Sequence, residues 1–223
     1  MIENLPLERG DRLVFLGDYV DRGPDSKGVV SYLLELQENS DYGFVFLKGN
    51  HEDMFLSYLG LPGEHGDMFL INGGKVTLDS YGLSTHRGAH ELLAQIPAAH
   101  LDFYKNLRNY YIVEPFLCVH AGIDPLKPLE EQTESDMFWI RNQFIYRSHM
   151  LPYIVLFGHT PQNDVLYDLP YKIGLDTGLV YGNKLTCLET REKMLYQINR
   201  GKKTVHQIPV QKNWDNLLAV LTP

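Results

Sequence analysis

Four short apolar runs divide the chain, and each of them ends at a polar or glycine-rich turn. Their length and their content of Val, Ile, Phe and Tyr are typical of buried strands. We therefore predict strands over residues 12–16, 43–47, 111–119 and 153–157. In each case an Asp, Asn or His follows the run within a few residues.

Helical spacing of apolar side chains lies between the predicted strands. Residues 26–38 and 52–59 each predict one helix, and residues 89–107 predict one or two helices broken near Pro97. Three alternating segments between residues 184 and 210 predict an antiparallel meander instead.

The order of these elements indicates an α/β fold with mixed sheets flanked by helices. No internal repeat, low-complexity tract or convincing linker interrupts the sequence, so we expect residues 1–223 to form a single domain. In sheets whose strands are separated by helices, ligands bind beyond the carboxyl ends of the strands. The four polar loops that follow the strands can therefore converge on one site.

Composition and charge narrow the classes of partner. The 223 residues are 44% hydrophobic and 22% charged, which is typical of a globular protein. The net charge is -8 and the longest basic run is Lys202-Lys203, so we expect no nucleic-acid partner. The acidic balance fits metal binding, but charge alone favours a solvated acidic surface.

Cysteine content and hydropathy bear on the compartment. Cys118 and Cys187 each lie in an apolar run, where buried free thiols are the default, and two cysteines make no disulfide framework. No signal peptide is visible after Met1, and no apolar stretch approaches the roughly 20 residues that span a bilayer. We expect a cytoplasmic protein without a membrane partner.

The string GDYVDRG at residues 17–23 carries the first candidate chemistry. Its two carboxylates, Asp18 and Asp21, are three residues apart, and Arg22 follows them. Oxygen ligands suit hard cations, and a guanidinium binds phosphate oxygens in a bidentate manner. A tight turn with a surface ion pair would explain this string equally well if it stood alone.

Three more polar positions follow the later strands. The Asn50 oxygen can bind a metal and His51 can protonate a leaving alkoxide, although Asn50 alone would be explained as a helix N-cap. His120 and His159 each follow a strand beside a Gly, and imidazole is a common ligand of zinc and iron. A single His at such a place is more often structural. The ordered set favours a site for metal and phosphate.

Together, four strings resemble successive motifs of the PPP-type phosphoprotein phosphatases, which are calcineurin-like metallophosphoesterases. They are GDYVDRG at residues 17–23, GNHE at 49–52, His-Ala-Gly at 120–122 and Phe-Gly-His-Thr at 157–160.

Secondary signatures narrow the resemblance to one branch. Asn72-Gly73-Gly74 and GLDTG at residues 174–178 are similar to signatures of small bacterial and phage Ser/Thr phosphatases and of symmetrical diadenosine tetraphosphate hydrolases. The resemblance spans residues 13–189 and implies a four-layer fold, with a mixed β-sheet sandwich flanked by helices. We expect the first strand of this fold to be missing from the sequence.

The resemblance implies two divalent cations, with Mn²⁺ expected and Fe or Zn also suited to these ligands. Asp18 matches the carboxylate that bridges both cations. Asn50, His120 and His159 match the other protein ligands of the second cation.

The remaining matches imply catalysis by a metal-activated water. His51 matches the proton donor to the leaving group and Asp21 the carboxylate that orients it. Arg22 matches a phosphate clamp, and Arg141 matches the second arginine. The implied substrate is a phosphorylated protein, a small phosphoester or a dinucleoside polyphosphate.

One family motif, Gly-Asp-x-His-Gly, is not found in the sequence. In the family its Asp and His ligate the first cation, and here sixteen residues precede Gly17 without any such string. The similar Glu64-His65-Gly66 lies out of order, after GNHE. We favour a native start upstream of Met1. The alternatives are a genuine one-metal or degenerate member of the family, or another group that completes this site. A degenerate or truncated pseudophosphatase would bind phosphate or a partner.

Overall fold

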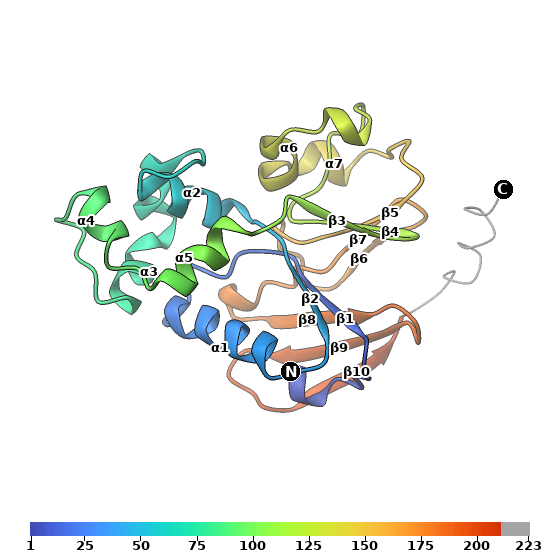
Figure 1. Cartoon of the computed structure of the whole chain (residues 1–223). Helices are drawn as coiled ribbons and strands as arrows, with labels where there is room; N and C mark the ends of the chain where they lie inside the picture. Colours follow the sequence, from blue (N-terminus) through green and yellow to red (C-terminus); the bar gives the residue numbers. More distant parts are fainter. Residues whose placement is uncertain (211–223) are drawn as a thin grey trace. The chain divides into compact units, whose positions relative to one another are not determined.

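The computed structural model describes residues 1–210. The chain divides into two compact units, and Figure 1 shows their elements. We call Glu8–Asn109 the helical unit. The second unit, which we call the sheet unit, comprises Met1–Leu7 and the described residues from Tyr110 to Val210. Among the described residues, we find no helix with the length and apolar character needed to cross a membrane.

The helical unit begins with a parallel pair of strands. β1 (Arg12–Phe15) pairs with β2 (Gly43–Phe46), and α1 (Ser26–Glu38) connects them. α1 starts at Ser26 because the Asp25 carboxylate accepts a hydrogen bond from the Gly28 backbone N–H at 2.8 Å. These two strands and this helix were all predicted from the apolar pattern.

Short helices make up the rest of the helical unit. Phe55 of the second helix is fully buried and stacks on Phe69, so this helix and the turn that carries Phe69 share one aromatic core. The predicted break near Pro97 is confirmed, since Pro97 is the N-cap of the last helix. The elements are α2 (Asn50–Tyr58), η2 (Gly66–Met68), the π-helical turn η3 (Leu70–Gly74), α3 (Lys75–Ser80), α4 (Ala89–Leu93) and α5 (Ala98–Lys105).

The sheet unit contains a five-stranded mixed sheet in the order β3-β4-β5-β7-β6. β4, β5 and β7 run parallel and every residue in them is buried, which is typical of strands covered on both faces. The strands are β3 (Tyr110–Val113), β4 (Phe116–Val119), β5 (Ile154–Phe157), β6 (Leu166–Asp168) and β7 (Lys172–Gly174).

The single strand predicted over residues 111–119 is wrong. This run folds into a hairpin in which β3 and β4 pair antiparallel, with Glu114 and Pro115 at the turn. Pro115 has no N–H to donate to a strand partner, so the chain turns there and the two apolar halves of the run pair as neighbouring strands.

The predicted meander is confirmed as a three-stranded antiparallel sheet in the order β10-β9-β8. The mixed α/β class predicted from the sequence is also confirmed. The strands are β8 (Lys184–Glu189), β9 (Met194–Asn199) and β10 (Val205–Pro209), and the helices and turns of this unit are η1 (Ile2–Asn4), η4 (Leu129–Glu131), α6 (Glu134–Trp139), α7 (Asn142–Ile145) and η5 (Leu179–Tyr181).

Candidate active site

The loop after β1 has an unusual backbone. Asp18, Asp21 and Arg22 adopt φ angles of 61°, 69° and 58°, in the left-handed region that side chains other than Gly rarely occupy. Such conformations cost free energy and persist only where the surroundings hold them. The three residues singled out from the sequence are therefore held in place by other parts of the unit.

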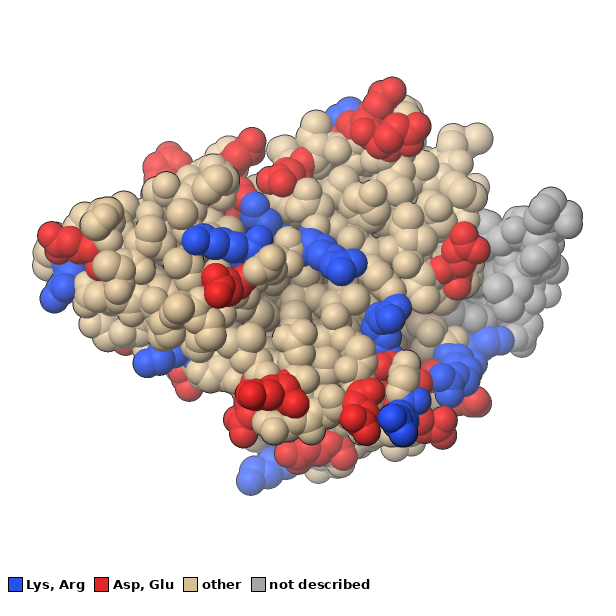
Figure 2. All heavy atoms as spheres, in the orientation of Figure 1, with Lys and Arg blue, Asp and Glu red and all other residues tan. Residues whose placement is uncertain are grey.

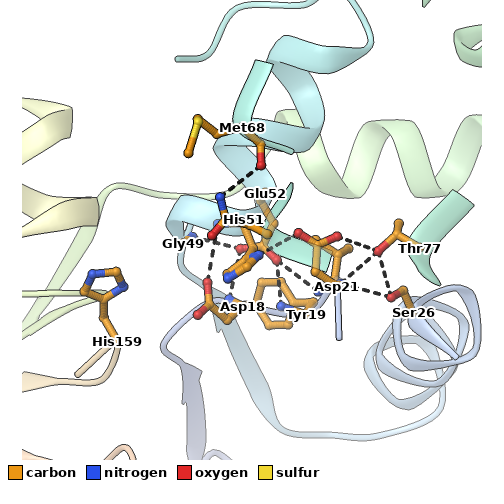
Figure 3. A network of polar contacts seen from close by, with 12 residues as sticks. Asp18, Tyr19, Asp21, Ser26, Gly49, His51, Glu52, Met68, Thr77 and His159 are labelled. Carbon is orange, nitrogen blue, oxygen red and sulfur yellow. Dashed lines mark hydrogen bonds and ion pairs between the residues drawn. The ribbon is translucent and has the colours of Figure 1, made fainter. Parts of the chain in front are cut away.

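A buried hydrogen-bond network fixes Asp21 and His51 (Figure 3). The Nδ1 atom of His51 lies 2.6 Å from Oδ2 of Asp21, and the Thr77 hydroxyl donates to Oδ1 of Asp21 at 2.6 Å. The backbone N–H of Asp21 donates to the hydroxyl oxygens of Thr77 and Ser26. The predicted pairing of His51 with Asp21 is thus present, and Thr77 and Ser26 are partners that the sequence did not reveal.

The environment of this pair favours a bound proton. Burial lowers the pKa of His51, but the hydrogen bond to Asp21 and the negative charges of Asp18 and Asp21 outweigh it, so the pKa is raised. Burial raises the pKa of Asp21, against the lowering effect of its hydrogen bonds and of the His51 charge. A buried imidazole that holds a proton next to an orienting carboxylate can serve as a general acid.

Asp18 lies against the start of α2, where Asn50 is the first helical residue. A Cβ atom added at Gly49 would lie 2.5 Å from Oδ1 of Asp18, so only glycine allows the two loops to approach this closely. The His51 backbone N–H points at the same Asp18 oxygen from 3.5 Å. The loops after β1 and β2 therefore meet, as the sequence predicted, and both carry oxygen donors suited to a divalent cation.

Glu52 is a residue of this region to which the sequence assigned no role. Its carboxylate is fully buried and accepts hydrogen bonds from the backbone N–H groups of Asp18, Tyr19, Val20 and Gly49. Burial and the neighbouring Asp18 charge raise its pKa, while the backbone donors at Asp18 and Gly49 lower it. A Glu three residues after a helix N-cap is a known sequence signal, but it predicts only the bond from the Gly49 N–H. The bonds from Asp18, Tyr19 and Val20 have no such signal.

Arg22 packs against the turn that contains the Asn72-Gly73-Gly74 signature. Gly73 has a φ of 100°, and a Cβ atom there would lie 3.0 Å from Cγ of Arg22. Arg22 therefore lies close against the backbone of Gly73 in η3, a π-helical turn of a kind common at functional sites.

In the sheet unit, His120 follows β4 and His159 follows β5. These strands are parallel neighbours, so their carboxyl ends share one edge of the sheet. Nε2 of His120 lies 3.2 Å from Nδ1 of His159, and both rings are buried. Two imidazole nitrogens that bind one cation at about 2.0–2.1 Å each would be separated by roughly 3.0–3.4 Å. The observed pair fits a shared metal ion.

Arg141 lies next to this histidine pair. Its Nη1 atom donates to the backbone oxygen of His159 at 2.9 Å, and Arg141 itself is the N-cap of α7. The loop after His120 is fixed to the same segment, because the Ala121 N–H donates to the Met137 oxygen at 2.8 Å. The predicted second arginine therefore belongs to the same corner of the sheet unit as both histidines.

The family is shown by comparison with known sequences. The family model of the calcineurin-like phosphoesterases matches residues 1–186, and the chain belongs to this family. Relatives include the asymmetrical bis(5'-nucleosyl)-tetraphosphatase PrpE of Oceanobacillus iheyensis, 26% identical over 82% of this chain and 75% of that protein. The protein of the same name from Anoxybacillus flavithermus is 25% identical over 82% of this chain and 77% of that protein.

Solved structures share the fold. The crystal structure of a candidate diadenosine tetraphosphatase matches with a TM-score of 0.57 at 21% identity, covering 91% of this chain and 82% of that chain. A protein serine/threonine phosphatase from Saccharomyces cerevisiae matches with a TM-score of 0.52 at 14% identity, covering 91% and 71%. The chain is therefore a metal-dependent phosphoesterase by family, and it shares its fold with these structures.

Proposed function

We propose that the protein hydrolyses dinucleoside polyphosphates, and that the residues predicted from the sequence carry the reaction. The names of its relatives support this substrate class over a phosphorylated protein. The single observation that carries the catalytic proposal is the buried contact of His51 with Asp21 at 2.6 Å. A protein that only binds phosphate has little use for an oriented acid.

The metal ligands in this proposal are Asp18, Asn50, His120 and His159. The carboxylate and amide oxygens suit Mn²⁺, and the 3.2 Å separation of the imidazole nitrogens fits a shared cation. Mn²⁺ is the favoured metal, with Fe or Zn suited to the same donors. When bound, divalent cations lower the pKa of the attacking water and neutralise charge on the phosphoryl group.

The remaining residues act on the phosphate and on the leaving group. Arg22 and Arg141 bind the non-bridging phosphoryl oxygens with their guanidinium groups. His51 donates its proton to the leaving phosphate oxygen as the bond to phosphorus breaks. Asp21 keeps the protonated ring aligned through the 2.6 Å contact. A reducing compartment such as the cytoplasm fits the two free thiols of Cys118 and Cys187.

The alternative is a pseudophosphatase that binds phosphate without turnover. The observation in its favour is that the sequence given carries no Gly-Asp-x-His-Gly string. Metal content separates the two proposals, because the hydrolase needs a cation to activate its water.

The test is hydrolysis of diadenosine tetraphosphate and of p-nitrophenyl phosphate, each with and without added Mn²⁺. Metal-dependent cleavage of the dinucleotide to ATP and AMP is expected if the chain acts as its named relatives do, and two molecules of ADP would indicate the symmetrical reaction. Cleavage of p-nitrophenyl phosphate alone would reject the dinucleotide as substrate. No turnover by a folded sample would favour the pseudophosphatase.

A further inference from the structure

The carboxylate of Glu52 connects the two loops that supply oxygen donors. Its Oε1 atom accepts from the N–H of Tyr19 at 2.6 Å and of Val20 at 3.2 Å. Its Oε2 atom accepts from the N–H of Asp18 at 2.9 Å and of Gly49 at 2.9 Å. One side chain thus joins three consecutive residues of the loop after β1 to the N-cap of α2.

The loop that Glu52 holds has a backbone conformation that is unfavourable for most of its residues. Gly17, Asp18, Asp21 and Arg22 all have φ values between 58° and 94°. Left-handed backbone at the three residues other than Gly costs free energy, and it needs contacts that outweigh this cost. The bonds to Glu52 lie inside this segment, at residues 18, 19 and 20, and so provide such contacts.

We propose that Glu52 is a positioning residue that sets the metal affinity of the protein by holding Asp18 beside Asn50. The proposal rests on the proposed function, in which both residues bind the cation. Glu52 itself points its oxygens at backbone N–H groups and takes no part in the chemistry. The close approach of Gly49 to Asp18 is the geometry that it maintains.

The substitution Glu52→Gln tests this role with almost no change in shape. A glutamine has one oxygen and one NH₂ group, and NH₂ is a donor only. If the NH₂ replaces Oε1, it faces the N–H groups of Tyr19 and Val20, and if it replaces Oε2 it faces those of Asp18 and Gly49. Either orientation breaks two of the four hydrogen bonds, because the NH₂ group then faces two buried backbone N–H groups.

The measurements are Mn²⁺ affinity by titration with electron paramagnetic resonance and amide exchange at residues 18–20 and 49. We expect Glu52→Gln to weaken Mn²⁺ binding about 10–100-fold, which is the range for loss of an outer-shell partner, and to speed exchange at these amides. Asp53→Asn is the matched control, because Asp53 is the next buried carboxylate of α2 but pairs with Lys48 and accepts from Glu64 N–H. We expect its Mn²⁺ affinity to remain that of the wild type.

Each outcome decides one point. Equal Mn²⁺ affinity in Glu52→Gln and wild type would overturn the role of Glu52, as would an equal loss in Asp53→Asn. If Glu52→Gln does not fold, Glu52→Asp is the deciding variant. An aspartate keeps the negative charge, but its side chain is one methylene too short to make all four hydrogen bonds. A wild-type Mn²⁺ affinity in Glu52→Asp would overturn the proposal. A folded wild type that binds no Mn²⁺ would instead overturn the proposed function.

Discussion

The Nδ1 atom of His51 lies 2.6 Å from the Oδ2 atom of Asp21 in a buried setting. The second oxygen of Asp21 accepts the Thr77 hydroxyl at the same distance, so the carboxylate is held from both sides. This geometry fixes the orientation of the His51 ring before any substrate binds.

Replacing the orienting carboxylate should impair turnover without loss of metal. In Asp21→Asn the negative charge and the strong acceptor for His51 disappear, so the ring loses both its alignment and the support for its protonated form. We expect kcat to fall by about 10²-fold, within the range for loss of acid catalysis, with Mn²⁺ content unchanged. Thr77→Ser keeps the hydroxyl and should retain near wild-type kcat, and an equal loss there would contradict this account.

Removing the acid itself should matter most for poor leaving groups. His51→Asn has no group that titrates, so the leaving oxygen departs as the unprotonated anion. We expect turnover of an alkyl phosphate to fall by about 10²–10⁴. The loss should be smaller with p-nitrophenyl phosphate, whose leaving group is already a stable anion. An equal loss of turnover with both substrates would argue against His51 as the proton donor. Unchanged turnover would contradict this role outright.

A methyl group at Gly49 should separate the two donor loops. The added Cβ would lie 2.5 Å from Oδ1 and 2.7 Å from the backbone nitrogen of Asp18, so Gly49→Ala requires the loop after β1 to move. We expect reduced Mn²⁺ binding together with a loss of about 1–3 kcal/mol in the free energy of unfolding. Gly88→Ala is the control for Mn²⁺ binding, because a Cβ there meets nothing within 4 Å and should leave the Mn²⁺ affinity unchanged. Its cost in the free energy of unfolding should be that of a helix N-cap alone, about 0.5–1 kcal/mol.

His149 should make the stability of the protein fall on acidification. Burial lowers its pKa, the Lys172 charge adds to this, and the Tyr171 carbonyl and the Asp168 charge oppose it. Its Nε2 lies 2.8 Å from the Tyr171 oxygen, and the ring stacks on Phe144, so a second proton would enter a buried place. The neutral ring is therefore the form that the folded protein prefers.

The direction of the effect follows from the lowered pKa. As the pH falls, the unfolded chain protonates His149 before the folded protein does, because the pKa is lower in the folded protein. The neutral His149 therefore contributes to the free energy of unfolding above about pH 6.5, and this contribution is lost as the pH falls below that value. The loss is at most about 1.4 kcal/mol per pH unit. Urea unfolding at about pH 7.5 and at about pH 5.5 measures this change in the free energy of unfolding. His149→Gln keeps a donor for the Tyr171 carbonyl and does not titrate, so its loss over this range should be smaller. Equal losses would contradict the prediction.

The sequence by itself determined the elements and the chemistry of the candidate residues. Apolar runs predicted β1, β2 and β5 and the helix after Asp25, because strand and helix periodicity is a local property. The strings around Asp18 and Asn50 identified the family that the match over residues 1–186 shows. The same reasoning failed at Glu114-Pro115, where the turn was hidden inside an apolar run.

Only the tertiary structure decided which partners hold these residues. Thr77 is 56 positions from Asp21 and Glu52 is 34 from Asp18, and no local pattern relates residues at such separations. Their contacts depend on how helices and loops pack, since a hydrogen bond needs its atoms within about 3 Å. The sequence could therefore supply the candidate acid and the candidate ligands, while packing around Glu52 and Thr77 decided how the loop that carries Asp18 and Asp21 is held.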